Sequence, residues 1–337
     1  MSPLSSSRSA MTPNASIQHP GASAPRTRER VLHVLSALDV YLILAALLVV
    51  ACWLSPSFLT LSNIGNVLTQ AAVLGILATG QFLVVLIGGF DLSVAAVMAL
   101  SSVLIAKHAD THLALAITEG LLAALACGIA SGVAVVVGRV QPLITTLAMM
   151  GVARGLAFSV SEKSLLVSNP WITGLSGASG VLTPPTLIWL ALVIVLSLWL
   201  GLTRAGLHCY AIGGNETTSR LAGVRADRIK IGVYAVSGLI AGIAGLALVI
   251  RSDSGVPNVG AGWELDSIAA IVIGGARLFG GEGSLPKAMT GVLIYQLIAN
   301  VMNLTGIDPY YQSIVRALVI VVAVGLSVFR QRKRDHV

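Results

Sequence analysis

Long apolar runs recur along the chain about every 20 to 40 residues, and short polar or glycine-rich segments separate them. A helix of about 20 apolar residues is long enough to cross the hydrocarbon core of a bilayer. The pattern therefore predicts about ten membrane-spanning helices, at 39–54, 71–88, 92–106, 113–137, 142–160, 187–202, 231–250, 267–276, 288–302 and 310–329.

Two places in this pattern predict broken helices or half-helices. Only "GGFD" separates the runs 71–88 and 92–106, and the short run 267–276 is followed by "RLFGGEGSLPK". Irregular backbone at membrane depth is tolerated only where protein or a water-filled cavity covers it. We therefore expect both segments to lie inside the protein or along an aqueous path.

Composition supports a membrane protein. Hydrophobic residues make up 55% of the chain and charged residues 10%, with a mean hydropathy of +0.88, whereas soluble domains average about 25% charged residues. We expect an all-α polytopic membrane protein with one membrane domain at 31–329. A disordered cytosolic tail at 1–30, rich in Ser, Pro, Thr and Arg, and a basic cytosolic tail at 330–337 flank it.

The distribution of Lys and Arg predicts the orientation. If the N-terminus is cytosolic and ten spans follow, sixteen of the 21 basic residues fall in cytosolic segments, and only Lys107, Lys163 and Arg251 fall on the other side. Such a bias is the positive-inside signature, and it places both termini in the cytosol. The net charge of +7 therefore reflects topology, and no basic patch interleaved with aromatics indicates nucleic-acid binding.

The largest internal cytosolic loop of this topology, 203–230, carries signals of local order. Asn215 is a good N-cap, Glu216 places a negative charge in the first helical turn, and Gly223 suits the left-handed position after the last turn. A helix over 216–222 is predicted. Because so short a helix is marginal alone, it either lies on the membrane surface or docks on a cytosolic partner.

Four segments, "GGFDLSVAAVMAL", "ITTLAMMGVARGLAF", "AIGGNETTSRLAGV" and "GWELDSIAAIVIGGARLFGGEGS", resemble the signature segments of the sugar-type permease subunits of bacterial ATP-binding-cassette (ABC) importers. That group includes ribose, xylose and arabinose permeases, and the resemblance covers about residues 60–329. It implies a subunit of the inner membrane that works with a second permease copy, either identical or paralogous. It also implies a cytosolic ABC ATPase and a periplasmic sugar-binding protein as partners.

The resemblance further implies that the segment 213–223 contains the coupling helix, which sits in a groove of the ATPase. The ATPase-coupling residues predicted on this basis are Gly213, Gly214, Asn215, Glu216, Ser219, Arg220, Leu221 and Gly223. One position departs from the family pattern. Phe279 stands where a small or hydroxylated residue is expected, which questions the packing of that turn.

The chain lacks the motifs of an ATPase. No G-x-x-x-x-G-K-[ST] sequence occurs, and "GGEGSLPK" has neither its spacing nor its hydroxyl. No catalytic grouping, metal cluster or cofactor site stands out either. We therefore predict a non-enzymatic permease whose ATP is hydrolysed by another chain.

Asp91 lies in "GGFDLS", between the end of one apolar run and the start of the next. Asp91 and Ser93 can cap the following helix by accepting hydrogen bonds from its unpaired backbone amides. Alternatively, the break at Gly88 and Gly89 and the helix end at Asp91 belong to the translocation pathway or its cytosolic gate, as broken helices do in other transporters. The resemblance favours the second interpretation.

Arg154 lies inside the run 142–160. A charge at the bilayer centre costs at least about 2.5 kcal/mol, so this side chain should face the protein interior, a cavity, or an interface that it reaches by snorkelling. Snorkelling is one explanation. The other is a polar residue that lines the sugar path, with Thr145 and Thr146 deeper on the same span.

The outer side carries a group of polar residues. Glu264 and Asp266 precede a short apolar run, where acidic side chains suit a helix N-terminus. With Arg251 and Asp253 of the preceding loop, they are equally consistent with a polar mouth that receives a binding protein and its sugar. Trp263 is either an interfacial anchor or a residue on which a sugar stacks.

The segment "GGARLFGGEGSLPK" is unusually rich in glycine. Such glycines permit close backbone approach, which either helix packing or a tightly packed gate requires. Gly274 and Gly275 are the gate candidates.

Two other classes of function fit the sequence less well. A stand-alone carrier or channel driven by an ion gradient would usually carry an acidic or histidine relay in the membrane, and only Asp91, Glu119 and Asp266 lie near spans. A membrane-embedded transferase would need a clustered catalytic site, which the sequence does not offer.

Overall fold

The computed structural model describes residues 27–177 and 180–308, together with 310–315, 317–319, 321, 322 and 325. Most of the predicted N-terminal tail and all of the tail at 330–337 lie outside these residues, while 27–30 already belong to a helix. The chain divides into two units, residues 1–39 and residues 40–337. Apart from the first part of the helix Thr27–Leu54, every feature described below lies in the second unit.

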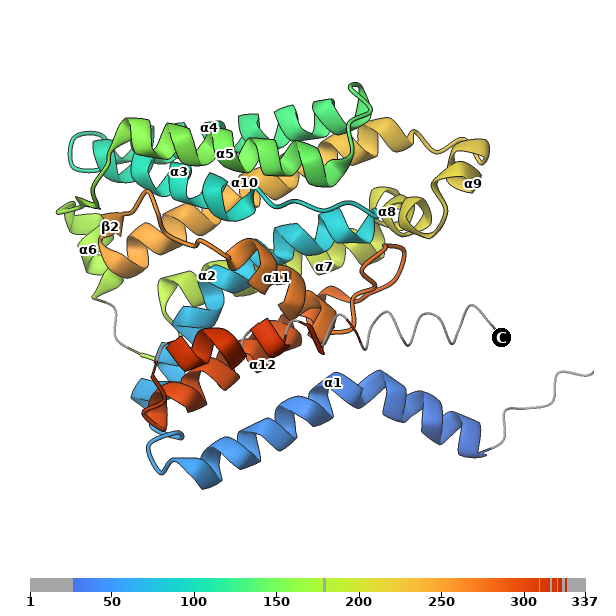
Figure 1. Cartoon of the computed structure of the whole chain (residues 1–337), viewed down its shortest axis with the longest axis horizontal. Coiled ribbons are helices and arrows are strands. Elements are labelled where there is room, and N and C mark those ends of the chain that lie inside the picture. The colour runs from blue at the N-terminus through green and yellow to red at the C-terminus, as the bar shows by residue number, and fades with distance from the viewer. Residues whose placement is uncertain are drawn as a thin grey trace, which may run out of the picture. The chain divides into compact units, whose positions relative to one another are not determined.

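Helices dominate the described residues (Figure 1). Their bounds are α1 Thr27–Leu54, α2 Leu61–Leu86, α3 Val94–His108, α4 Leu113–Val136, α5 Pro142–Val160, α6 Pro170–Ser176, α7 Pro184–Leu202, α8 Arg204–Gly214, α9 Glu216–Leu221, α10 Ala226–Ser252, α11 Trp263–Ile273 and α12 Leu285–Leu304. Two short strands, β1 Leu165–Leu166 and β2 Ser254–Gly255, pair antiparallel. The described part of the run 310–329 is also helical.

Within the described residues, each predicted apolar run overlaps a helix, so the all-α polytopic fold is confirmed. Within the described residues, α2, α4, α5, α7 and α10 are long and apolar enough to cross a membrane. Shorter apolar stretches cover 39–54 and 94–108. The predicted breaks are also present: residues 87–93 separate α2 from α3, and α11 has only 11 residues.

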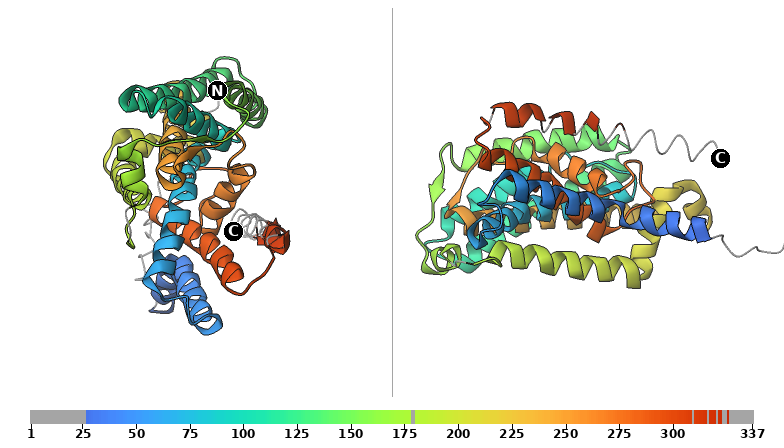
Figure 2. Two further views of the ribbon diagram at one scale, coloured as in Figure 1. Left: turned by 90° about the vertical axis from the view of Figure 1, so that its left-hand side faces the viewer. Right: turned by 90° about the horizontal axis from the view of Figure 1, so that it is seen from below.

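The core is built around α2 and α10. In the most apolar stretch of α2, 83% of the residues are buried, against 22% in α5 and α7. Seen end-on, α3, α4 and α5 gather on one side of these two helices, and α12 lies on the other (Figure 2). The exposed apolar faces of α4, α5 and α7 suit lipid, because their side chains have no polar surface to offer water.

Paired amide side chains join α2 to α12. The side chains of Asn63 and Asn300 exchange two hydrogen bonds of 3.2 and 2.8 Å between Nδ2 and Oδ1 atoms. Two turns after Asn63 on α2 and one turn before Asn300 on α12, a second amide pair forms: Gln296 Nε2 donates to Gln70 Oε1 at 2.8 Å. Because each amide has a partner, these polar residues are tolerated between apolar helices.

The connecting segments gather at two opposite ends of the helices. In Figure 1, α8 and α9 lie at one end, and α6 and β2 lie at the other. We call the first the α8–α9 end and the second the β end. The two ends hold the two groups of candidate site residues.

Candidate functional site

The polar segment at 203–230 forms two helices and the start of a third at the α8–α9 end (Figure 1). The predicted helix over 216–222 is present as α9, which covers Glu216–Leu221. The preceding helix, α8, was not predicted. Its N-cap is Thr203, whose Oγ1 accepts a 3.1 Å hydrogen bond from the amide of Gly206.

Both ends of α9 are capped by the residues that the sequence indicates. Asn215 Oδ1 accepts from the amide of Thr218 at 2.9 Å, and Ser219 Oγ donates to the Asn215 carbonyl at 2.8 Å. At the other end, Gly223 has φ +85°, and the amide of Val224 donates to the Ser219 carbonyl at 3.0 Å. This is the Schellman arrangement, which satisfies the last carbonyls of a helix.

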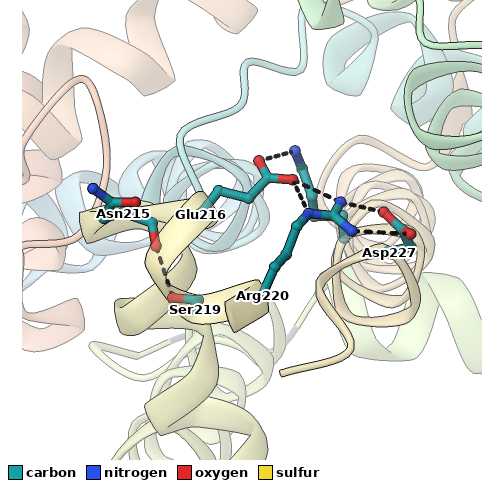
Figure 3. Close-up of polar contacts among 6 residues, drawn as sticks. Asn215, Glu216, Ser219, Arg220 and Asp227 are labelled. Carbon is teal, nitrogen blue, oxygen red and sulfur yellow. Dashed lines mark hydrogen bonds and ion pairs between the residues drawn. The ribbon is translucent and has the colours of Figure 1, made fainter. Parts of the chain in front are cut away.

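Ion pairs hold α9 against the first turns of α10 (Figure 3). Glu216 accepts from Arg220 Nη2 at 2.8 Å and from Lys230 Nζ at 2.8 Å. Arg220 reaches across to Asp227, with 3.2 Å between Nη1 and Oδ2. Exposed ion pairs contribute at most about 1 kcal/mol each, but together these fix the orientation of α9. The sequence did not reveal Asp227 and Lys230 as partners.

The charge of Glu216 is stabilised by its neighbours. Partial burial of this carboxyl raises its pKa, but the hydrogen bonds and charges of Lys230 and Arg220 outweigh that effect, so the pKa of Glu216 is lowered overall. The hydrogen bond to Asp227, followed by the one to Glu216, raises the pKa of Arg220 above its ordinary value. Both groups are therefore charged at neutral pH, and their pairing is intact there.

The outward side of α9 is open. Leu221 is 85% exposed, and the neighbouring Thr217 and Thr218 are exposed as well. Leu221 is the last residue of α9, so the caps and ion pairs of this helix fix the position of its apolar side chain. The arrangement offers a small, pre-oriented apolar contact point.

Backbone packs directly on backbone where α8 meets the core. A Cβ atom added to Gly213 would collide with the carbonyl oxygen of Leu86 and the amide nitrogen of Gly281. A Cβ on Gly280 would lie 2.7 Å from the amide nitrogen of Gly88, and the amide of Gly281 donates to the Leu86 carbonyl at 2.9 Å. We call these five residues the glycine junction. It joins α8, the end of α2 and the loop 274–284.

The two predicted breaks therefore meet, which the sequence did not reveal. Gly88 has φ +77°, a conformation that only glycine adopts readily. Tyr210 of α8 adds a further link, because its hydroxyl donates to the Gly283 carbonyl at 3.0 Å. The side chain of Phe279 is 61% exposed, so the turn is formed by backbone contacts and tolerates this departure from the family pattern.

Beyond the glycine junction, Asp91 is buried between the start of α3 and α10. Its Oδ1 accepts from the amide and the hydroxyl of Ser93 at 3.0 and 2.6 Å, and its Oδ2 accepts from Ser237 Oγ at 3.1 Å. Thr146 of α5 and Tyr234 of α10 both donate to the carbonyl of Phe90, each at 3.4 Å. Asp91 thus anchors the start of α3, and Gly89 is packed against the Tyr234 hydroxyl.

The remaining gate candidates differ in their surroundings. A Cβ on Gly274 would collide with the backbone of Lys287 and Ala288, so this glycine permits close packing of α11 on α12. Gly275 has φ +87° and open space around it. Thr145 is buried without a hydrogen-bond partner for its hydroxyl among the described residues.

At the β end, Arg154 holds the loop between β2 and α11. Its Nη1 donates to the carbonyls of Pro257 and Val259 at 2.7 and 3.0 Å. The guanidinium therefore donates hydrogen bonds to backbone carbonyls, and these contacts stabilise a charge inside an apolar span. Neither of the two explanations offered by the sequence included this contact.

The other outer residues lie around the same loop. Asp253 ends α10 in a left-handed conformation, and its Oδ2 accepts from Ser176 Oγ at 2.8 Å. Glu264 accepts from the amide of Gly262 at 3.2 Å, and Asp266 accepts from the Tyr295 hydroxyl at 2.5 Å. Both acids occupy the first turn of α11, as predicted. Arg251 is exposed, and Trp263, at the first residue of α11, is half-buried.

Comparisons with known proteins show which family the chain belongs to. A family model described as the permease component of a branched-chain amino acid transport system matches residues 63–324. The ribose import permease protein of Escherichia coli strain K12 is 39% identical over 289 residues, which cover 83% of this chain and 90% of the relative.

Two further relatives extend the match. The ribose import permease protein of Bacillus subtilis strain 168 is 36% identical, covering 90% of this chain and 97% of its own length. The L-arabinose transport system permease protein of Escherichia coli strain K12 is 34% identical, covering 96% and 100%. No solved structure matches the chain.

Proposed function

The chain belongs to the family of transport-system permease components that matches residues 63–324, and from that premise we propose that it is the membrane-spanning subunit of an ATP-driven sugar importer. The solute is a monosaccharide or a similar neutral sugar, because the relatives that cover most of the chain are ribose and arabinose permeases. The apolar spans hold few ionisable side chains, as suits a path for an uncharged, hydroxylated solute.

The observation that carries this proposal is the presentation of α9. This helix has caps at both ends, ion pairs to α10, and Leu221 projecting from its tip with 85% of its surface exposed. A separate cytosolic ATPase that binds Leu221 in a groove would supply the missing contact. The chain has no phosphate-binding loop of its own, so the ATPase is a different polypeptide or domain.

The contacts of α8 supply a route from α9 into the membrane. Movement of α9 is transmitted to α8, and the glycine junction connects α8 to the end of α2 and the loop 274–284. Three residues after Gly88 of the junction, Asp91 joins the break to α10 through Ser237. In this mechanism the break at 87–93 belongs to the gate, and closure of the ATPase changes its packing.

The orientation of the protein in the membrane determines which partners lie at each end of its helices. The α8–α9 end faces the cytosol, since that arrangement places most Lys and Arg residues inside. The β end then faces the periplasm, where the loop held by Arg154 and the exposed Arg251 form part of the surface for a sugar-binding protein. The membrane is the bacterial inner membrane, and a second permease copy completes the pathway. A stand-alone ion-coupled carrier is not favoured by the family match.

Two matched substitutions test the coupling contact. Leu221→Asp puts a charge on the tip of α9, and Leu166→Asp makes the same change at the β end, where Leu166 is 78% exposed. Loss of a central apolar anchor commonly costs about 2 kcal/mol or more, so we expect Leu221→Asp to lower co-purification of the ATPase at least about tenfold. Leu166→Asp should leave co-purification unchanged.

Two measurements decide this test: co-purification of the ATPase and uptake of the solute. Retention of both ATPase and uptake by Leu221→Asp at the level of the unmodified protein would sink the coupling role of α9. Solute uptake into liposomes by the purified permease alone, with no ATPase present, would sink the importer assignment itself.

A further inference from the structure

An apolar groove of about 370 Å³ lies between α2, α7, α8 and α10 near the α8–α9 end. Apolar side chains line it, including Val195 and Trp199 of α7 and Ile229 and Val236 of α10. Val195 is 61% exposed, so the groove opens on the surface of the helices. Its floor includes Gly232, where an added Cβ would find no atom within 4 Å.

Three arginines surround the end of this groove. Arg204 directly precedes Ala205, which lines the groove at the start of α8. Arg225 is the N-cap residue of α10, and Arg228 lies in its first turn, one turn before the lining residue Gly232. Side chains on a helix lean toward its N-terminus, which carries the Arg228 cation past the end of the groove.

None of these arginines has an acidic partner among the residues that the structure describes. All three are exposed. The acidic residues of the segment 203–230, Glu216 and Asp227, are already paired with Arg220 and Lys230. The groove therefore combines an apolar trough with positive charge that the protein itself leaves unneutralised.

We propose that this groove binds an anionic phospholipid of the inner leaflet. One acyl chain lies along the trough beside Trp199, and the phosphate of the headgroup is held by Arg204 and Arg228. The cytosolic placement of the α8–α9 end, on which the choice of leaflet depends, rests on the proposed function. Basic residues at the cytosolic end of a gap between spans are the expected recognition chemistry for anionic headgroups.

The charges favour a lipid over a second copy of the chain. A two-fold contact through this groove would set the same arginines of both copies against each other, and like charges in contact disfavour association. An anionic lipid instead neutralises them and fills the apolar trough.

Native mass spectrometry of the purified full-length permease tests the proposal with phosphatidylglycerol and phosphatidylcholine as probes. The unmodified protein should retain phosphatidylglycerol preferentially. Arg204→Gln with Arg228→Gln should reduce that preference by about fivefold for each arginine removed. The matched control, Lys107→Gln with Lys163→Gln, removes two exposed charges at the β end and should bind lipid as the unmodified protein does.

A second pair of variants tests the trough itself. Gly232→Phe places a ring in the groove without a backbone clash and should lower retention of both lipids. Gly201→Phe, in open space on α7 and outside the groove, should not. Equal retention of the two lipids by the unmodified protein, or unchanged retention by both the double arginine variant and Gly232→Phe, would overturn the proposal.

Quenching of Trp199 gives a second readout, in which the unmodified protein itself is compared with the two lipids. Phosphatidylglycerol with brominated acyl chains should quench tryptophan fluorescence more than brominated phosphatidylcholine does, and Trp199→Phe should remove that difference. An identical response to both lipids contradicts the proposal. Because neither assay contains an ATPase, they fail or succeed independently of the coupling role of α9, which co-purification measures.

Discussion

Single residues of α9 were predictable because their signals are local. Asn215, Glu216 and Gly223 each act on backbone or charge within four residues along the chain, so their types alone indicate a capped helix. Asp227 and Lys230 were not predictable as partners. The turn after Gly223 folds α10 back toward α9, and no pattern of residue types specifies that angle.

Gly213 offers a sharp test of the glycine junction, because its neighbour Gly214 provides a matched control. Gly213→Ala forces a methyl group against the Leu86 carbonyl, and such overpacking costs about 1–3 kcal/mol. Gly214→Ala meets no atom within 4 Å and should be neutral or stabilise α8 by up to about 1 kcal/mol. Thermal unfolding in detergent measures both, and equal stability of the two variants would contradict the observed packing.

Glu216 predicts a dependence of stability on acidity. Its pKa is lower in the folded protein than in the unfolded chain, so the folded state binds fewer protons between the two values. The stabilisation is complete above the ordinary pKa of about 4.3 and is lost as the pH falls through the lowered pKa. Glu216→Gln should reduce this loss in thermal unfolding measured from pH 6 down to about 3.

The matched control for that experiment is Glu162→Gln. Glu162 is exposed in the loop after α5 and forms no ion pair among the described residues. It should keep the acid response of the unmodified protein. An acid-induced loss in Glu216→Gln as large as that of the unmodified protein would argue against the role of its ion pairs.

At the scale of helices, the apolar runs located the spans but misplaced some of their ends. The run at 71–88 corresponds to α2, which begins ten residues earlier, at Leu61. The polar residues Asn63 and Gln70 lower the hydropathy of the first turns of α2, so the apolar run begins only after them. Both form hydrogen bonds with side-chain amides of α12. The hydropathy pattern of one segment does not indicate such a partner on another helix.

The helix α8 was missed for a related reason. Its sequence contains Arg204 and His208 and ends in two glycines, which together are typical of a loop. Gly213 is nevertheless helical, because its missing side chain lets α8 approach Leu86 and Gly281. Tertiary packing here outweighs the low helix propensity of glycine.

The cap of α9 yields a prediction at this scale. Asn215→Ala removes the acceptor for the Thr218 amide and should destabilise the helix by about 1 kcal/mol. Hydrogen–deuterium exchange of the peptide covering 216–221 should then be about fivefold faster. Asn215→Asp keeps the cap and serves as the control. Unchanged exchange in Asn215→Ala would show that α9 does not depend on this bond.

Across the whole molecule, the order of the helices was predictable, but which connections meet was not. Gly88 and Gly280 are 192 positions apart along the chain, yet they lie in backbone contact. Pairing of distant segments depends on helix crossings, for which one sequence without relatives carries no direct signal. The charge asymmetry predicts on which side of the membrane each end lies, because it acts on every loop independently.

This placement of the two ends predicts opposite labelling of two positions. In a variant without its native cysteines, Thr217→Cys lies at the α8–α9 end and Ser164→Cys at the β end, both exposed. A membrane-impermeant maleimide should label position 164 in right-side-out vesicles and position 217 in inside-out vesicles. Labelling of both positions from the same side would refute the proposed orientation.

The glycine junction has one mechanical consequence. Contacts between side chains absorb small displacements by changing rotamers, but carbonyl and amide groups in direct contact have no such freedom. A shift of α8 by even a fraction of an ångström must therefore displace the end of α2 by a similar amount. The smallest residues of the chain therefore make this connection a rigid one.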